Sequence, residues 1–249
     1  MYKAILFDLD GTLLPMDQET FTAAYFAALS KNLSALGYAP KTLLGGVQKG
    51  LEAMVNNRGD QTNEAVFWQA FSGYAGEQIL SHKARFDAFY ETEFDGLCRI
   101  CGKNEEAGPT VKALKARGYR LVLASNPVFP AVAQKARMRW AGVDPADFEW
   151  ITAYENAHYC KPNVLYYREI ATALALSPED CLMVGNDVRE DMVAAEIGMG
   201  VFLMPEFLLN RDKKSINPYP RGSFSQLTAF IEKSAEGCGQ APKQNGGSV

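Results

Sequence analysis

Near its N-terminus the chain reads Tyr2-Lys3-Ala4-Ile5-Leu6-Phe7-Asp8-Leu9-Asp10-Gly11-Thr12-Leu13-Leu14. The apolar run from Ala4 to Phe7 has the length and bulk of a buried strand. Because side chains two apart in an extended chain point to the same side, Asp8 and Asp10 can face one small volume. These like charges repel each other unless one carboxyl is protonated, a divalent cation lies between them, or a Lys or Arg approaches. Each arrangement predicts a functional site.

The composition narrows the class of protein. With 249 residues, of which 47% are hydrophobic, the chain can bury the core of one or two domains. A net charge of −4, from 25 basic and 29 acidic side chains, argues against a nucleic-acid or anionic-membrane surface. The direct entry into the first strand predicts no export signal, and no apolar run reaches the roughly 20 residues that span a bilayer. Five scattered cysteines fit a reducing compartment, so we expect a soluble cytoplasmic α/β protein.

Residues 16–102 have helical periodicity without strand-like alternation. Apolar residues recur three and four apart, and Gly- and Pro-containing breaks separate the segments. We expect helices over Phe21–Leu36, Leu43–Asn56, Glu64–Phe71 and Glu77–Phe94. Six aromatic residues recur at helical spacing and are interpreted as the core of this block, with the alternative left open that one or two of them line the pocket: Phe67, Trp68, Phe71, Phe86, Phe89 and Tyr90.

After Gly108, short apolar runs alternate with helical segments. The expected strands are Arg120–Ala124, Phe148–Thr152, Cys181–Val184 and Gly200–Met204, and the expected helices are Pro109–Arg117, Ala131–Trp140, Asn163–Leu174, Glu190–Ile197 and Ser225–Lys233. This alternation predicts a Rossmann-like, mostly parallel sheet with helices on both faces, a three-layer α/β/α core. We expect residues 1–15 and 103–235 to form this core and residues 16–102 to form an inserted, all-helical cap. The polar tail, 236–249, is expected to be disordered.

Polar residues follow the predicted strands at one edge of the sheet, where ligands bind in such folds. They form four groups: Asp8/Asp10, Ser125/Asn126, Lys161 and Asp187/Asp191. Three carboxylates without a histidine favour Mg²⁺ over zinc or copper. The turn at Ser125 offers donors to an anion, and Lys161 adds a positive charge. A metal, a lysine and backbone donors around a carboxylate nucleophile are the parts needed for phosphoryl transfer.

These motifs, in this order, resemble the haloacid dehalogenase-like hydrolase superfamily, in the phosphatase-type branch with a helical cap after the first motif. The resemblance implies that Asp8 is the nucleophile and a Mg²⁺ ligand. It implies that Asp10 is the general acid and base, with its backbone carbonyl on the metal. Ser125 and Asn126 would bind the substrate phosphate, and Lys161 would bind it as well and steady Asp8.

The resemblance assigns the remaining motif residues as well. Asp187 would complete the metal site, and Asp191 would orient the set from behind. Gly11 and Thr12 would lie in the turn that couples the site to the cap. Many relatives carry an acidic residue where Pro15 stands here, so the hinge into the cap departs from the common pattern.

The expected activity is hydrolysis of a small phosphorylated metabolite through an aspartyl-phosphate on Asp8. Three alternatives stay open: a phosphomutase of the same fold, a metal-independent dehalogenase, and a non-catalytic protein that binds a phosphometabolite. Asp10 and Asp187 argue against the dehalogenase. The spacing of Cys98 and Cys101 suits a metal, but no second pair completes a zinc site. The substrate and the oligomeric state are not specified by these motifs.

Overall fold

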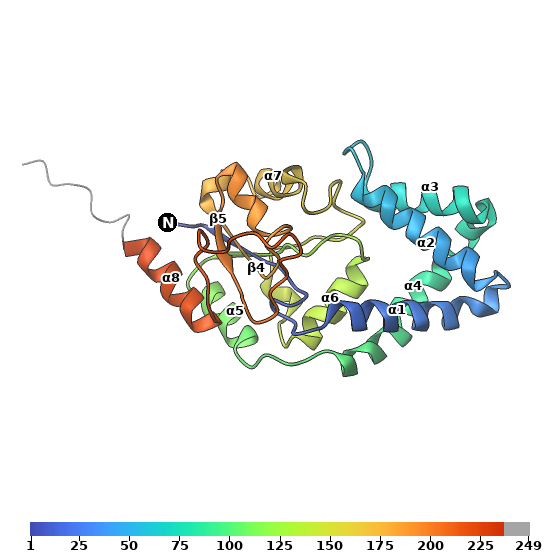
Figure 1. Ribbon diagram of the computed structural model, residues 1–249, viewed down its shortest axis with the longest axis horizontal. Helices are drawn as coiled ribbons and strands as arrows, with labels where there is room; N and C mark the ends of the chain where they lie inside the picture. The colour runs from blue at the N-terminus through green and yellow to red at the C-terminus, as the bar shows by residue number, and fades with distance from the viewer. Residues whose placement is uncertain (237–249) are drawn as a thin grey trace, which may run out of the picture.

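A sheet of five parallel strands forms the centre of the computed structural model, which describes residues 1–236 (Figure 1). Its order is β3-β2-β1-β4-β5. The strands are β1 (Ala4–Phe7), β2 (Arg120–Leu123), β3 (Trp150–Ile151), β4 (Cys181–Gly185) and β5 (Gly200–Leu203). Phe7 is aligned with Leu123 on one side and with Val184 on the other. The residues that follow β1, β2 and β4 therefore leave the sheet at one level.

Helices cover both faces of the sheet, as predicted. Alternate residues of β1 enter two separate cores, with Ile5 and Phe7 in one and Ala4 and Leu6 in the other. The first core packs against α5 (Ala107–Ala116), α6 (Ala131–Trp140) and α8 (Phe224–Glu236). The second packs against α7 (Val164–Ala173) and the 3₁₀ helix η6 (Met192–Ile197), which completes a three-layer α/β/α domain.

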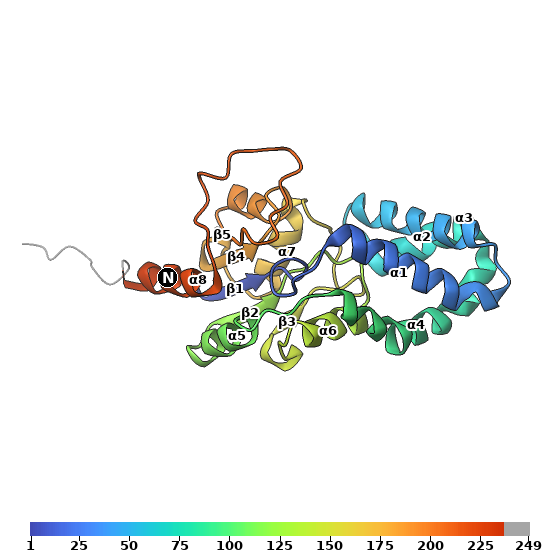
Figure 2. The same cartoon turned by 60° about the horizontal axis from the view of Figure 1, so that its bottom comes forward.

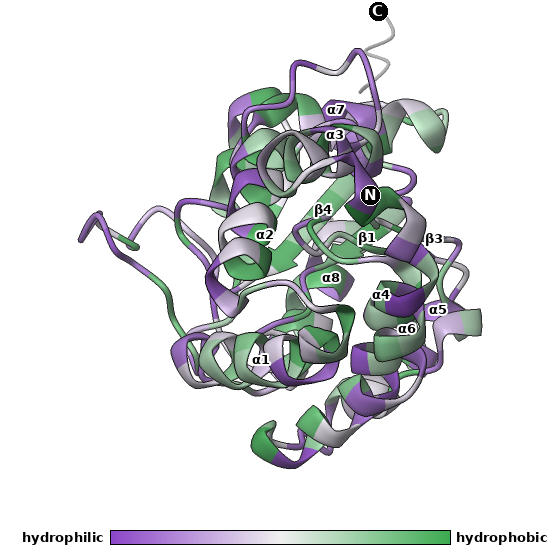
Figure 3. Cartoon of the chain, turned by 90° about the vertical axis from the view of Figure 1, so that its right-hand side faces the viewer, coloured by the Kyte–Doolittle hydropathy of each residue, from purple (hydrophilic) through white to green (hydrophobic). Residues whose placement is uncertain are grey.

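A block of helices lies beyond the carboxyl ends of the strands (Figure 2). It consists of α1 (Gln18–Leu33), η1 (Ser34–Leu36), α2 (Pro40–Val55), α3 (Asn63–Ala75), η2 (Glu77–His82), α4 (Lys83–Glu91) and η3 (Glu93–Ile100). This block is the cap. Figure 3 views the chain from the side of the cap, and the hydrophobic strand β4 lies behind the cap helices. In the chain, these helices all lie between β1 and α5, so the cap is an insertion after the first strand.

In the core, two short 3₁₀ helices, η4 (Pro145–Asp147) and η5 (Pro178–Asp180), lead into β3 and β4.

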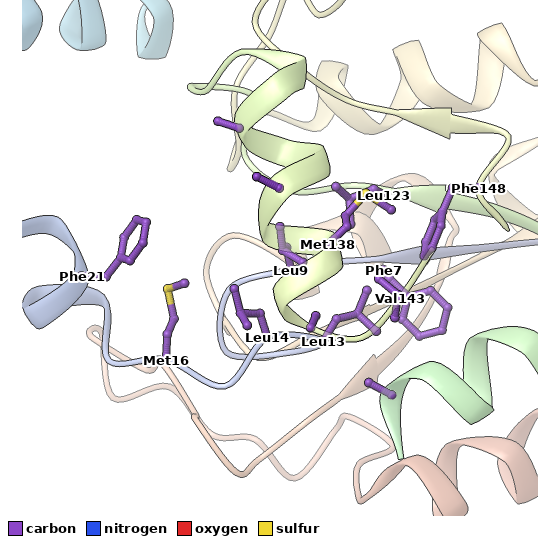
Figure 4. Close-up of a cluster of buried hydrophobic side chains, with 14 of the residues drawn as sticks. Phe7, Leu9, Leu13, Leu14, Met16, Phe21, Leu123, Met138, Val143 and Phe148 are labelled. Atoms are coloured by element: carbon purple, nitrogen blue, oxygen red, sulfur yellow. The ribbon is translucent and has the colours of Figure 1, made fainter. Parts of the chain in front are cut away.

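The passage from β1 into the cap is anchored by apolar side chains. Leu9, Leu13 and Leu14 are fully buried beside α6, and Met16 and Phe21 continue the cluster towards the cap (Figure 4). The N–H of Gly102 donates to the carbonyl of Pro15 at 2.7 Å, so the segments that enter and leave the cap lie side by side. The division at 15/16 and 102/103 stays a prediction.

Several expected boundaries are wrong. The single helix expected over Glu77–Phe94 is three helices, because the backbone leaves the helical path at His82 (φ −100°, ψ 5°) and at Thr92 (φ −122°, ψ −80°). The helix expected over Glu190–Ile197 is a 3₁₀ helix that starts at Met192. The third strand is only two residues long, because it pairs with β2 alone at Trp150 and Ile151.

The expected disordered tail, apart from Glu236 at the end of α8, lies outside the described residues. Within residues 1–236, no helix has the length and apolar character that a bilayer crossing requires.

Candidate active site

The turn after β1 orients the two aspartates. The N–H of Asp8 donates to the Val184 carbonyl at 2.9 Å, which continues the ladder between β1 and β4 by one residue. The N–H of Gly11 then donates to Leu14 at 2.8 Å and closes a tight loop. Gly11 has φ +85°, and a Cβ there would lie 2.2 Å from the Asn186 side-chain nitrogen. Both the left-handed backbone and the close approach require glycine at this position.

Asp8 belongs to a buried ionic network with Lys161 and Asp191. The Lys161 Nζ donates to Asp8 Oδ1 at 2.9 Å and to Asp191 Oδ1 at 2.6 Å. Burial opposes the charge on Lys161, but the Asp191 and Asp8 carboxylates outweigh it and raise the lysine pKa well above its ordinary value. Burial also raises the pKa of Asp191 to about 7, and the Lys161 ammonium opposes that rise. Lys161 is therefore a fixed positive charge beside the predicted nucleophile.

Thr12 supports Asp8 from the other side. Its Oγ1 lies 3.3 Å from Asp8 Oδ2 and 3.2 Å from Asn186 Oδ1, so its one proton can be donated to either. Both carboxylate oxygens of Asp8 thus have a neighbouring donor. The sequence predicted Thr12 as a turn residue, and the structure adds this contact with Asp8.

Asp187 is held by the turn that follows β4. Its Oδ1 accepts the backbone N–H groups of Arg189 at 2.8 Å and Glu190 at 3.0 Å. Its Oδ2 accepts a hydrogen bond from Arg211 Nη1 at 2.7 Å, a partner that no sequence motif indicated. Asp191 closes the turn, because its Oδ2 accepts the N–H of Asp187 at 2.9 Å.

The polar residues after β2 face the same volume. The Ser125 side chain is buried, and its backbone carbonyl accepts bonds from Thr152 Oγ1 and the Tyr166 hydroxyl, each at 2.9 Å. Asn126 Nδ2 donates to Glu190 Oε2 at 3.3 Å. No sequence motif indicated that Thr152 and Tyr166 bind the Ser125 carbonyl or that Glu190 binds Asn126. These three partners lie on separate elements.

Asp10 has a buried partner that sequence reasoning missed. Arg137, on α6, has no exposed surface; its guanidinium donates to Asp10 Oδ2 and to Gln134 Oε1. The guanidinium carbon lies 4.4 Å from the centre of the Phe129 ring. Burial raises the pKa of Asp10, whereas the charge of Arg137 opposes the increase. The sequence predicted that a Lys or Arg could relieve the repulsion between Asp8 and Asp10. Arg137 is such a cation, and it binds Asp10 rather than Asp8.

A cavity of about 280 Å³ joins the strand ends to the cap. Six of the predicted site residues line it: Asp8, Asp10, Ser125, Asn126, Asp187 and Asp191. Lys161 reaches it through its bond with Asp8, and Gly11 and Thr12 form the adjoining turn. The structure thus brings all nine predicted residues to one place. Their catalytic and binding roles stay predictions.

More of the cap aromatics border the cavity than the one or two expected. Phe71 and Phe89 are fully buried and do not border the cavity, as expected for core residues. The other four line the cavity: Phe67, Trp68, Phe86 and Tyr90. An apolar helix face has the same periodicity whether it meets another helix or a cavity.

The donor set fits a divalent cation. Five carboxyl groups line the cavity, and three cationic side chains pair with members of this set in the described chain, so the carboxyl groups outnumber their cationic partners. Hard oxygen ligands of this kind suit Mg²⁺. Among residues 1–236, His, Cys, Asp and Glu side chains form no metal-binding group of three or more. Two carboxylates would therefore need a backbone carbonyl, or oxygens from water or substrate, to complete the coordination.

Comparisons with known proteins identify similar sequences and a similar fold. Residues 2–197 match the family model described as haloacid dehalogenase-like hydrolase. The chain is 27% identical over 221 residues to the glyceraldehyde 3-phosphate phosphatase of Methanothermobacter thermautotrophicus, which covers 87% of this chain and 91% of that protein. It is 28% identical over 202 residues to the pyrimidine 5'-nucleotidase PynA of Streptococcus pneumoniae. That match covers 77% of this chain and 78% of that protein. The solved 2-haloacid dehalogenase of Pseudomonas syringae pv. Tomato shares the fold, with a TM-score of 0.63 at 16% identity over 94% of this chain and 100% of that one.

Proposed function

The chain belongs to the haloacid dehalogenase-like hydrolases, and from this premise we propose that it is a Mg²⁺-dependent phosphohydrolase acting through an aspartyl-phosphate on Asp8. The observation that carries the proposal is the position of the Asp8 carboxylate: it faces the cavity between Lys161 and Thr12. Membership of a hydrolase family favours an enzyme over a non-catalytic binding protein. The relatives named as a phosphatase and a nucleotidase support phosphate esters as substrates.

In the first half of the reaction, a carboxylate oxygen of Asp8 forms a bond to phosphorus while the bond from phosphorus to the alcohol oxygen breaks. The Asp10 carboxyl gives its proton to the departing oxygen, so the alcohol leaves neutral. Burial raises the pKa of Asp10, and the charge of Arg137 opposes that rise. Lys161 offsets the negative charge on Asp8 and on the phosphoryl group.

In the second half, water attacks phosphorus and the bond between phosphorus and Asp8 breaks. The Asp10 carboxylate accepts the water proton, and inorganic phosphate leaves. Ser125 and Asn126, with the backbone at the start of the following loop, would hold the phosphoryl oxygens throughout.

The side chains of Asp8 and Asp187, with the backbone carbonyl of Asp10, would hold Mg²⁺. When bound, the ion supplies positive charge that offsets the charge of the phosphoryl oxygens. Arg211 now donates to Asp187 Oδ2, and its exposed side chain could move away without disturbing the core.

The free thiols of Cys98, Cys101, Cys160 and Cys181 support a cytoplasmic location.

The test is release of inorganic phosphate from a panel of phosphate esters, with and without Mg²⁺. Asp8→Asn keeps the shape of the side chain but removes the nucleophile, and we expect turnover to fall by at least ~10³-fold. Asp60→Asn, at an exposed position in the cap, serves as the matched control. Wild-type turnover by Asp8→Asn would refute the mechanism.

Two related activities are separated in the same assays. A phosphomutase would interconvert sugar phosphates, primed by a bisphosphate, without releasing inorganic phosphate. A dehalogenase would release halide from a 2-haloacid and keep its activity in EDTA. Either result, in the absence of phosphate release, would replace the proposed function.

A further inference from the structure

The cavity has two chemically different ends. Its base carries the polar residues at the strand ends, and the rest of the wall is almost entirely apolar or aromatic. This apolar wall combines residues of α1 to α4 with the loops after β2 and β3, and six of its members are Phe26, Leu29, Leu51, Phe67, Trp68 and Phe86. Whatever the phosphate is esterified to must fit against this surface when the phosphate lies at Asp8.

The wall offers no positive charge to a substrate. In the described part of the chain, the residues that line the cavity include no lysine, arginine or histidine. The cations nearest its base are already paired, Lys161 with Asp8 and Asp191, Arg137 with Asp10, and Arg211 with Asp187; of these cations, Arg211 alone has an exposed side chain. A second anionic group on the substrate would lose its hydration without gaining a countercharge, which is strongly unfavourable.

The polar groups of the wall are neutral. The Tyr25 and Tyr90 hydroxyls are 2.7 Å apart and bind each other, and burial raises the pKa of Tyr25 to about 12. The indole Nε1 of Trp68 is buried and has no hydrogen-bond acceptor among the described residues. With Gln18, Thr22 and Tyr154, the wall can offer hydrogen bonds to a neutral oxygen, but none of these side chains is a cationic partner for an anionic group.

We propose that the substrate is the phosphate monoester of a neutral, predominantly hydrophobic alcohol. The inference rests on the proposed phosphohydrolase function and specifies its substrate class. A cavity of about 280 Å³ is near the lower end of the ~300–1,000 Å³ usual for small-molecule sites, so the alcohol is small. The phosphate meets the polar base, and the carbon skeleton displaces water from the apolar wall.

The decisive comparison uses two esters of the same heavy-atom shape. Isobutyl phosphate and phosphoglycolate differ in that two methyl groups of the first are replaced by the carboxylate oxygens of the second. We expect kcat/KM to be at least ~100-fold higher for isobutyl phosphate, because the carboxylate would be buried without a partner. Equal values, or a preference for phosphoglycolate, would overturn the inference.

A homologous series measures the apolar wall directly. Ethyl, butyl and hexyl phosphates have leaving groups of nearly equal reactivity, so differences report on binding. At about 0.8 kcal/mol for each buried methylene, kcat/KM should rise about 4-fold per added methylene until the cavity is filled. A flat series would contradict hydrophobic recognition.

Two cap variants locate the effect. Phe26→Ala shortens a half-buried side chain of the wall, and it should lower kcat/KM by a larger factor for hexyl phosphate than for ethyl phosphate. Tyr74→Ala, which removes an exposed aromatic of α3 outside the cavity, should change neither. Leu51→Arg adds a cation to the wall and should shift preference towards phosphoglycolate. Unchanged selectivity in both wall variants, with unfolding transitions like the wild type, would count against the assignment.

The outcome separates this inference from the function on which it rests. Mg²⁺-dependent, Asp8-dependent hydrolysis with a preference for phosphoglycolate overturns the substrate class and leaves the phosphohydrolase intact. Absence of phosphate release from every ester in both sets overturns both. Hydrolysis that favours isobutyl and hexyl phosphates supports both.

Discussion

Arg137 is the buried cation whose removal should be felt most. Its guanidinium has no exposed surface and bonds to Asp10 and Gln134, while the Asp10 side chain is 20% exposed. Arg137→Met keeps an unbranched apolar chain of similar length in α6 and removes the charge. Asp10 is then left at the cavity without its counterion.

The magnitude follows from this geometry. Breaking a buried ion pair by removing one partner costs about 3–5 kcal/mol. The remaining exposure of Asp10 lets water or a proton relieve part of that cost, whereas the lost stacking of Arg137 on Phe129 adds to it. We expect a loss of about 3 kcal/mol in the free energy of unfolding. For a chain of this size, that lowers Tm by about 6–12 °C.

A double-mutant cycle distinguishes the ion pair from a simple packing defect. Asp10→Asn alone leaves the Arg137 charge buried, so it should also destabilise. In Arg137→Met/Asp10→Asn neither charge remains, so the combined loss should fall at least about 2 kcal/mol short of the sum of the single losses. Urea unfolding of the four proteins supplies the values.

Arg139→Met is the matched control, because this exposed arginine lies two residues along the same helix. Its substitution should change stability by no more than about 0.5 kcal/mol. The reasoning is refuted if Arg137→Met is as mild as this control, or if the losses from the two single variants simply add.

Gly37→Ala should lower the free energy of unfolding by about 1 kcal/mol, because Gly37 has φ +78° but a Cβ there would meet no other atom. Gly11→Ala should lower it by at least about 2 kcal/mol, because the new Cβ would also meet a side chain. Equal losses in urea unfolding would contradict this difference. Lys161→Met should lower kcat by ~10²–10³-fold, since it removes the positive charge beside the predicted nucleophile, and a fall of less than tenfold would argue against that role. At pH 8, iodoacetamide should alkylate exposed Cys98 well before Cys160, whose pKa burial raises to about 12; peptide mass spectrometry showing equal rates would contradict the buried position.

Much of the fold follows from local pattern. The strand Ala4–Phe7 and the helix Ala131–Trp140 have the predicted bounds, because uninterrupted apolar runs and helical periodicity are properties of short segments. The helix expected over Glu77–Phe94 failed because non-helical backbone at His82 and Thr92 divides it, and the apolar spacing does not mark those breaks. The third strand failed similarly, since the length of an edge strand is set by its single partner.

The site shows the same division. Residues at strand ends, such as Asp8, Ser125 and Asp187, could be predicted to share an edge because parallel strands all point the same way. Arg137 could not, because its partner Asp10 lies 127 residues earlier and a lone arginine in a helix usually faces water. Burial of this charge depends on the tertiary contact that neutralises it.

The sequence alone therefore specifies the parallel sheet, the helical insertion and the edge where the carboxylates gather, since each follows from chain direction and periodicity. Only the tertiary structure decides which apolar faces meet each other and which border an empty volume. Phe71 and Trp68 lie three residues apart on α3 and both are buried, yet only Trp68 also lines the cavity. The difference arises because a cavity is what several distant elements leave unfilled, and no single segment encodes it.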